Sequence, residues 1–456
     1  MTKLRFAPAT TGHLPIASAR IALAAYLFAR RHKGEFSLWL DDLDPDRGRP
    51  EYLAAIAHDL RWLGLSWEET TRQSSRLDRY ELAADRLKAT GRLYPCFENE
   101  DELRFKREMR VKRGQAPVYD RAMLKLTPEQ RAAAEANGKR PYWRFRLTDT
   151  TVAWIDMVQG KQHVKLTSVS DPVMIRADGL AMHLFTSVVD DIDAATTHIL
   201  RGDEQLIGTG IQIDLFSALG VNPTRLNFGH LPALTDTMGE KPSRRFDKIT
   251  LRGLRADGME PAAIAAYLAR LGTAKSPAPA NLDQLAASFD LSRFTEPTAR
   301  FDAAALLALN RRVLAGLTFD QVAERLPEGA TEGFWNLLRG HLDLLSEARL
   351  WWDIVAGSIV APVIENPDGS LRTALATLPP EPWNRDALAA WLDSLPAPDQ
   401  ALRLALTGEA QGGPHLADLL QWMTRPRAAE RLRSAVHAQG PELPDPASQD
   451  NSARRS

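Results

Sequence analysis

Short apolar runs alternate with amphipathic helical patterns over residues 1–95. Strand-like runs occur at residues 4–6 and 36–40, and helical patterns occur at residues 19–31, 50–63 and 75–90. Strands that alternate with helices in this way favour a parallel sheet with helices packed on it. Ligands of such sheets bind at the carboxyl ends of the strands. We therefore expect a site at the loop after Phe6 and the acidic run after Leu40.

The pattern changes between residues 97 and 191. A short basic helical stretch at residues 104–113 is followed by strand-like runs at residues 142–147, 152–155 and 173–175. The alternation then resumes with a strand at residues 197–200 and a helix at residues 209–219, which Gly220 ends. The middle segment is thus predicted to be an insertion between two halves of one sheet.

Beyond residue 255 the pattern is helical. A helix is predicted at residues 259–270, a Pro/Ala linker at residues 276–280 and a single long helix at residues 334–355. Asn384 is expected to cap a further helix that contains Leu388 and Trp391. The polar, proline-containing end of the chain is predicted to be disordered.

Composition narrows the protein class. A length of 456 residues allows two to four domains, and contents of 44% hydrophobic and 25% charged residues are ordinary for a soluble globular protein. A net charge of −1 means that any nucleic-acid surface must come from local charge asymmetry. The single Cys96 excludes an internal disulfide and a Cys-rich zinc site. Neither a signal peptide nor an apolar run of about 18 residues is found, so we expect a cytoplasmic protein without a membrane span.

Residues 5–23 carry the strongest chemical signal. A strand, a Pro/Thr/Gly loop and a helix N-terminus together form an anion site, because free N–H groups and the helix dipole point at the bound group. For other residues, the sequence pattern alone is also consistent with positions that have no functional role. Arg5 would be a surface arginine, Asp41 would lie in an acidic turn, and Asp190 and Asp191 would lie in a solvated turn.

The sequences of several segments resemble those of glutamyl-tRNA synthetase. RFAPATTGHLPIASARIAL, which begins at Arg5, resembles the first signature of class I aminoacyl-tRNA synthetases, in the form RFAPSPTGxLHIGxARTAL. SVVDDIDAATTHILRGDE, at residues 187–204, resembles VVDD…THVIRGED, and residues 241–245 fall at the mobile KMSKS loop. RLYPCFENEDEL, YDRA, YWRFRL and LRLALTGE also match, so the resemblance extends from residue 1 to about residue 440. The chain is similar to bacterial glutamyl-tRNA synthetase, most of all to its short, zinc-free second-copy forms.

This resemblance implies an α/β Rossmann-type parallel sheet with an inserted α+β acceptor-binding domain, followed by an all-α anticodon-binding region. The implied divisions are residues 1–96 and 191–255 for the two catalytic halves, 97–190 for the insertion, 256–300 for a helical junction, 301–438 for the anticodon-binding domain and 439–456 for the tail.

The resemblance also implies roles for individual residues. The glutamate-binding residues would be Arg5, Ala7, Asp41, His183 and Arg201. The ATP-binding residues would be Pro8, Gly12, Pro15, Ile16, Ala17, Ser18, Lys241, Ser243, Arg244 and Arg245. The tRNA-binding residues would be Arg104, Lys106, Arg107, Arg110, Lys112 and Arg113, for which a solvated helix face is an equally favoured interpretation.

The ATP signatures depart from the family pattern. The family's His-Ile-Gly-His/Asn reads Pro15-Ile16-Ala17-Ser18 here. Loss of one hydrogen bond to a transition-state charge commonly costs about 100- to 1,000-fold in rate. Ala17 places a methyl group where the family's glycine lets adenine approach the backbone. The second signature carries Pro242 and Arg244.

Two hypotheses of different classes follow. The first is a glutamate–tRNA ligase of reduced activity that uses ATP, Mg²⁺, glutamate and tRNA, needs no zinc and acts as a cytoplasmic monomer. The second is a synthetase paralogue that has lost activation chemistry and acts as a tRNA- or glutamate-binding protein. Transfer of glutamate to another acceptor is a third possibility, which the retained helical C-terminus disfavours.

Overall fold

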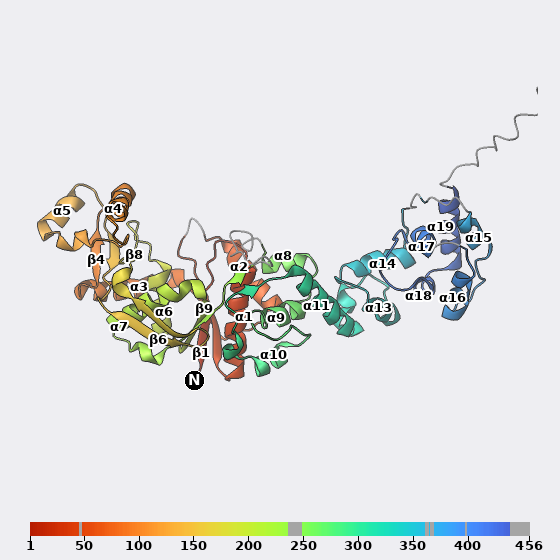
Figure 1. Cartoon of the computed structure of the whole chain (residues 1–456), viewed down its shortest axis with the longest axis horizontal. Coiled ribbons are helices and arrows are strands. Elements are labelled where there is room, and N and C mark those ends of the chain that lie inside the picture. Colours follow the sequence, from red (N-terminus) through yellow and green to blue (C-terminus); the bar gives the residue numbers. More distant parts are fainter. Residues whose placement is uncertain (45–47, 236–248, 361–363, 365–368, 397–398, 438–456) are drawn as a thin grey trace, which may run out of the picture. The chain divides into compact units, whose positions relative to one another are not determined.

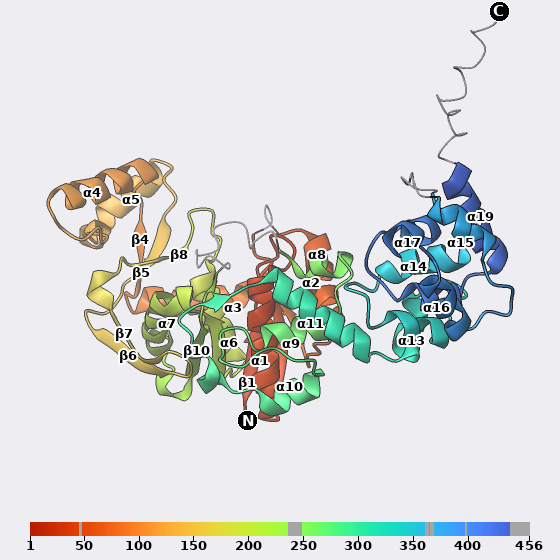
Figure 2. The same cartoon turned by 45° about the vertical axis from the view of Figure 1, so that its right-hand side comes forward.

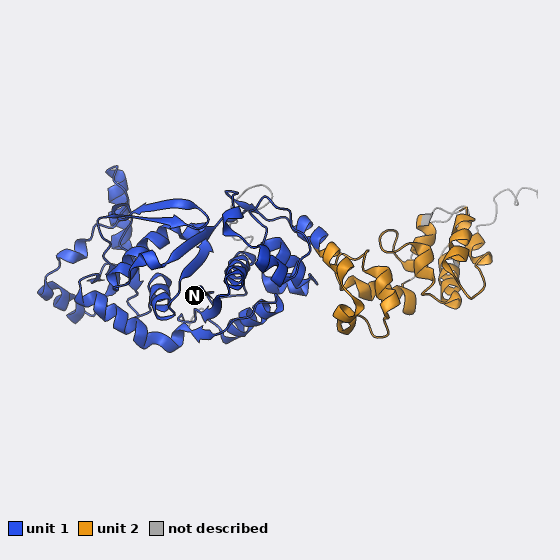
Figure 3. Cartoon of the chain, turned by 90° about the horizontal axis from the view of Figure 1, so that it is seen from below, with its two compact units in different colours: residues 1–309 blue, residues 310–456 orange. Residues whose placement is uncertain are grey.

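The structure is a computed structural model, and it describes residues 1–44, 48–235, 249–360, 364, 369–396 and 399–437. The chain forms two compact units, residues 1–309 and residues 310–456 (Figure 3). None of the helices in these described ranges combines the length and apolarity needed to cross a bilayer.

A parallel sheet forms the base of the first unit. Strand β2 (Glu35–Leu40) lies between β1 (Lys3–Phe6) and β3 (Thr70–Arg72), and β9 (His198–Gly202) pairs with β10 (Asn227–Leu231), all in parallel. The Thr197 amide donates to the Lys3 carbonyl at 3.0 Å, which joins β9 to the free side of β1. The strand order is therefore β3-β2-β1-β9-β10. The direction in which strands are added reverses between β1 and β9, which is where such sheets bind ligands.

Helices cover this sheet and enclose its core. Helix α1 (Ile16–Arg31) is buried along most of its length, and it contacts β1, β9 and α10 (Leu282–Ser288) (Figure 1). It begins three residues before the predicted start, because the extended backbone of Pro15 leads directly into the first turn. The other helices here are α2 (Pro50–Trp62), α3 (Leu77–Ala89), α6 (His183–Asp193), α7 (Leu206–Ala218), α8 (Leu251–Ala256) and α9 (Pro261–Leu268). The short pair β11 (Leu234–Thr235) and β12 (Ala299–Arg300) precedes α11 (Ala303–Gly316).

The predicted insertion has its own small antiparallel sheets. Strand β5 (Tyr142–Phe145) lies between β4 (Leu93–Cys96) and β8 (Val173–Ile175), and β6 (Thr151–Asp156) forms a hairpin with β7 (Gly160–Lys165), a strand that the sequence pattern missed. Helices α4 (Glu100–Lys112) and α5 (Pro128–Ala136) lie side by side in both views (Figures 1 and 2). A capping box between Asn99 and Glu102 starts α4, and α4 buries none of its residues.

The second unit is helical and has a separate apolar core. Its described helices are α12 (Phe319–Val322), α13 (Glu332–Leu338), α14 (Glu347–Ala356), α15 (Ser370–Ala376), α16 (Arg385–Asp393), α17 (Asp399–Thr407), α18 (Leu416–Leu420) and α19 (Arg425–His437). Asn384 caps α16 as predicted, because its side chain accepts a hydrogen bond from the Ala387 amide. The residue-level domain divisions remain predictions, and the predicted tail lies outside the described residues.

The prediction of one helix over residues 334–355 is wrong. Two helices, α13 and α14, are separated by a turn in which Leu342 and Leu345 still enter the core. Gly340 lies in this turn, and Asn310 donates its side-chain N–H to the Asp343 carbonyl there. Apolar spacing alone does not distinguish a continuous helix from two helices whose connection is also buried.

Candidate active site

A cavity of about 290 Å³ opens at the reversal point of the parallel sheet. Its walls come from the ends of β1 and β9, the first turns of α1 and the inner face of α6. The sequence-predicted residues that line it are Arg5, Ala7, Pro8, Ser18, His183 and Arg201. Residues far apart in sequence therefore meet where the strand topology predicts a ligand.

Arg5 is a buried arginine that already has an internal partner. Its Nε donates to Asp191 Oδ1 at 2.6 Å and its NH2 donates to the Ser187 carbonyl at 2.7 Å. The two ion-paired side chains are 7% and 2% exposed, so the interpretation of Arg5 as a surface arginine is wrong. Burial alone would lower the pKa of Arg5, but the adjacent Asp191 carboxylate outweighs burial and raises it.

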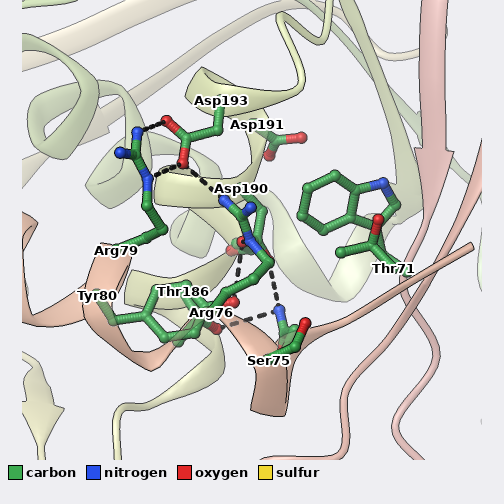
Figure 4. A network of polar contacts seen from close by, with 12 residues as sticks. Thr71, Ser75, Arg76, Arg79, Tyr80, Thr186, Asp190, Asp191 and Asp193 are labelled. Atoms are coloured by element: carbon green, nitrogen blue, oxygen red, sulfur yellow. Dashed lines mark hydrogen bonds and ion pairs between the residues drawn. The ribbon is translucent and has the colours of Figure 1, made fainter.

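A buried polar network holds α6, and with it Asp191, in place (Figure 4). Asp190 accepts hydrogen bonds from Arg76 at 3.0 Å, from Tyr80 at 2.9 Å and from Gln73 at 2.6 Å. Arg76 also donates a hydrogen bond to Asp193, at 2.6 Å. Asp190 and Asp191 are nearly completely buried, which contradicts their interpretation as a solvated turn. Sequence pattern cannot foresee this, because the donors are supplied by a segment more than a hundred residues earlier.

Arg201 differs from Arg5 in having no side-chain partner in the part of the chain that the structure describes. No hydrogen bond or ion pair of its side chain occurs within the described residues, although it lines the cavity beside Arg5 and Asp191. Burial lowers the pKa of Arg201 to about 10; the Asp191 carboxylate opposes this shift and the Arg5 guanidinium adds to it. The cavity thus presents a guanidinium that is available to an anion.

Two residues that line the same cavity each have a buried side-chain oxygen with no hydrogen-bond donor among the described residues. These oxygens are Asp191 Oδ2 and Gln212 Oε1. The Gln212 side-chain N–H group donates to Ser187 Oγ at 2.6 Å, which directs the amide oxygen elsewhere. Buried polar atoms are normally satisfied, so an unpaired cation beside two unpaired acceptors indicates a ligand with both an anionic and a donor group. The sequence analysis missed Gln212, which no local pattern distinguishes from an ordinary helix residue.

Asp41 reaches the cavity only through another residue. Its Oδ2 lies 3.3 Å from Nδ1 of His183, and His183 lines the cavity whereas Asp41 does not. The backbone of Asp41 is held by Thr10 and Pro8, in a bridge beside Ala9. Asp41 therefore lies behind the site, with its backbone held in place.

The first signature segment is hydrogen-bonded to the chain that follows the second signature. The Ile16 amide donates to the Ile249 carbonyl at 2.9 Å, and the Leu251 amide donates to the Leu14 carbonyl at 3.0 Å. Lys241, Ser243, Arg244 and Arg245 themselves lie outside the described residues. Pro15 precedes α1 without any side-chain cap, Gly12 has open space around its α-carbon, and Ala17 is partly buried in the first turn.

The His13 side chain contacts Arg252 and Tyr52. Its Nε2 lies 3.3 Å from Arg252 NH1, and its ring packs edge-on against Tyr52. It is not among the residues that line the cavity at the reversal point.

The basic stretch on α4 divides into two faces. Lys106, Arg107 and Arg110 line a hollow of about 80 Å³ beside Tyr119 and Arg144. Arg104 instead pairs with Asp101 on the same helix. Lys106 forms ion pairs with Glu98 and Asp120, and these carboxylates compensate its positive charge. Arg107 and Arg110 therefore carry most of the uncompensated charge of this face.

The fold and cavity define a Rossmann-type α/β protein with a small cavity lined by charged side chains at the sheet reversal. Residues 1–308 match the family model described as "tRNA synthetases class I (E and Q), catalytic domain". "Glutamate--tRNA ligase 2" of Granulibacter bethesdensis is 55% identical, with 96% of this chain and 98% of that protein covered. "Glutamate--tRNA ligase 2" of Acidiphilium cryptum is 53% identical, with 96% and 100% covered.

A solved structure shows the same fold. The glutamate-tRNA synthetase from Elizabethkingia anophelis superposes with a TM-score of 0.78 at 22% identity, covering 95% of this chain and 99% of that one. The chain belongs to the glutamate–tRNA ligase family of class I aminoacyl-tRNA synthetases. The sequence-based assignment to this family is thereby confirmed.

Proposed function

We propose that this chain activates glutamate with ATP and transfers it to tRNA(Glu) or a related tRNA, with the cavity between β1 and β9 holding the amino acid. The single observation that carries this proposal is the unpaired Arg201 guanidinium beside the unpaired oxygens of Asp191 and Gln212. A planar guanidinium binds a carboxylate through two parallel charge-assisted bonds. The two acceptor oxygens suit an ammonium group. Glutamate carries both a carboxylate and an ammonium group, and it is small enough for this cavity.

The proposed roles of the glutamate-contacting residues follow their placement. Arg201 would bind a carboxylate directly. Arg5, which Asp191 holds in place, would contribute positive charge and its remaining N–H groups to the same carboxylate. Asp41 would act through His183, which it orients, rather than by touching the ammonium group. Ala7 would contribute backbone at the end of β1.

ATP is the second substrate, and the observed residues fit it in part. The α1 N-terminus has no acidic residue in its first turn, and Ser18 there lines the cavity, which favours a bound phosphate. Class I synthetases use ATP with Mg²⁺, which would neutralise phosphate charge here. The glutamate carboxylate would attack the α-phosphorus and release pyrophosphate. The terminal ribose hydroxyl of tRNA would then attack the activated carbonyl and release AMP.

One observation favours the alternative of an inactive, tRNA- or glutamate-binding paralogue. Pro15 offers no side-chain donor at the start of α1. A donor missing from the developing charge lowers the rate, whereas the amino-acid cavity is independent of it. Reduced activity, independence of zinc, a monomeric state and a cytoplasmic location remain proposals.

The test is ATP-dependent attachment of labelled glutamate to tRNA by the purified chain, with a Pro15→His/Ala17→Gly double variant alongside. Attachment by the natural chain supports the ligase, and we expect a rate about 100-fold or more below that of the double variant. Attachment by the double variant alone would favour the binding paralogue. No attachment by either protein would contradict the ligase proposal.

A further inference from the structure

The side chain of Trp39 lies against two arginines of the first unit. Its ring centroid is 5.5 Å from the guanidinium carbon of Arg5 and 4.9 Å from that of Arg76. Both distances fall in the range over which the negative face of an aromatic ring attracts a cation. Trp39 is 4% exposed and does not line the catalytic cavity. Any effect of Trp39 on the ligand site must therefore pass through these neighbours.

The sheet places Trp39 beside Arg5. Ser37 of β2 is the register partner of Arg5 of β1, and Trp39 follows Ser37 by two residues, so these side chains project from one face of the sheet. The indole Nε1 donates to Ser37 Oγ at 3.1 Å, which fixes the orientation of the ring. Arg76 reaches the same ring from the short helical turn that precedes α3.

Each of the two arginines is also held by one of two successive aspartates of α6. Arg5 Nε donates to Asp191 at 2.6 Å, and Arg76 Nε donates to Asp190 at 3.0 Å. Asp190, Asp191 and Arg76 are seen together in Figure 4. Each guanidinium thus contacts both a carboxylate and the indole ring, and the two contacts together restrict its orientation.

Arg5 does not form the two-bond pair with Asp191 that arginine and carboxylate groups commonly adopt. Its Nε donates to Asp191 Oδ1, whereas its NH2 donates to the Ser187 carbonyl at 2.7 Å. Asp191 Oδ2 is buried and accepts no hydrogen bond from the described residues. A rotation of the guanidinium would bring NH2 onto this oxygen and complete the pair. The observed orientation therefore leaves a favourable bond unmade.

We propose that Trp39 is a positioning residue for glutamate binding, whose ring holds Arg5 in the orientation that leaves Asp191 Oδ2 unpaired. A rotated guanidinium would lose its contact with the ring face, so the ring opposes the two-bond pair. With the ring in place, Asp191 Oδ2 remains an acceptor for the ammonium group of the ligand, and the outer N–H groups of Arg5 remain donors for its carboxylate. The inference rests on the proposed function, because it takes glutamate as the ligand.

The test compares glutamate binding by the full-length chain and by its Trp39→Leu variant, using calorimetric titration without ATP or tRNA. Leucine offers no ring face, so we expect glutamate affinity to fall about tenfold. Trp39→Phe keeps a ring face and should stay within about threefold of the natural chain. In attachment of glutamate to tRNA, W39L should raise KM for glutamate and change kcat by less than about twofold, because substrate and transition state use these contacts equally.

The matched control is Trp351→Leu in the second unit. Trp351 is 5% exposed, and the guanidinium carbon of Arg403 lies 5.8 Å from its ring centroid. The two leucine variants therefore remove the same buried indole and the same kind of arginine contact. Both should lower the unfolding temperature, but W351L should change glutamate affinity by less than about twofold.

A milder variant guards against misfolding of W39L. Ser37→Ala removes only the oxygen atom that orients the indole ring, and it should weaken glutamate binding by about threefold. If W39L does not fold, S37A decides the question, and an unchanged glutamate affinity of S37A then overturns the proposal. Equal weakening by W39L and W39F would also overturn it, because the ring face would then have no special role.

The remaining outcomes separate this inference from the proposed function. If the natural chain binds no glutamate, both the proposed function and this inference fail. If the natural chain binds glutamate and W39L binds it equally well, only this inference fails. A structure of W39L in which Arg5 still contacts a single oxygen of Asp191 would likewise overturn this inference alone.

Discussion

Replacing Arg201 with glutamine should make the ligand-free protein more stable and its glutamate binding weaker. In the free protein the Arg201 guanidinium has no partner among the described residues and is desolvated by burial, so its charge opposes folding. With glutamate bound, the same charge gains a carboxylate. A gain in stability together with a loss of glutamate affinity is expected only if Arg201 serves to bind a ligand and not to stabilise the fold.

The structure gives the size of both effects. A pKa lowered from 12.5 to about 10 corresponds to about 3 kcal/mol against the charged form, at about 1.4 kcal/mol per pKa unit. This penalty is present at all pH values below the lowered pKa, because the arginine is then charged in both the folded and the unfolded chain. Removing it should raise the unfolding temperature by up to about 5 °C. Loss of a buried charged partner weakens binding by about 2–5 kcal/mol, or about 30-fold or more.

Arg5→Gln is the matched control, since it removes the same side chain from the neighbouring position. It leaves Asp191 buried and unpaired, so it should destabilise the protein by about 3–5 kcal/mol. The assays are thermal unfolding of the ligand-free variants and calorimetric titration with glutamate. If R201Q lowers the unfolding temperature as R5Q does, and glutamate affinity changes by less than about threefold, Arg201 is a structural residue and the reasoning is refuted.

Two further predictions concern titratable groups outside the ligand cavity. Hydrogen bonds from Arg79 and Arg76 lower the pKa of Asp193, so its carboxylate stabilises the fold above a pH of about 4 and this contribution is lost as the pH falls through the lowered value. Between about pH 5 and pH 2, the unfolding temperature of Asp193→Asn should therefore fall less than that of the natural chain. The same pH dependence of unfolding temperature in both proteins would contradict this role. Burial raises the pKa of the Cys96 thiol to about 12, so a disulfide reagent at pH 8 should label it slowly in the native protein and fully after unfolding. Rapid stoichiometric labelling of the native protein would show that this thiol is accessible.

The sequence was most informative where a local period determines the outcome. Strand β8 lies where the pattern predicts it, and β1 and β2 each begin one residue earlier, because apolar spacing and β-propensity are properties of the segment itself. The break between α13 and α14 was missed because both helices and their connecting turn face one core. Strand β7 was missed because its sequence, GKQHVK, is almost entirely polar and none of its residues is fully buried, although partly buried and exposed positions alternate.

For the site, the sequence by itself determined the family, the predicted anion-binding segment at residues 5–23 and the candidate arginines, because motif spacing is a property of the sequence. It could not rank Arg5 against Arg201, since both belong to strands of the same sheet and carry the same charge. Only the tertiary structure decided that Asp191 neutralises Arg5 and that Arg201 remains available. It also buried Asp190 under Arg76 and Tyr80 and placed Trp39 against the guanidinium groups of Arg5 and Arg76. The physical reason is that charge compensation and desolvation depend on neighbours brought from distant parts of the chain.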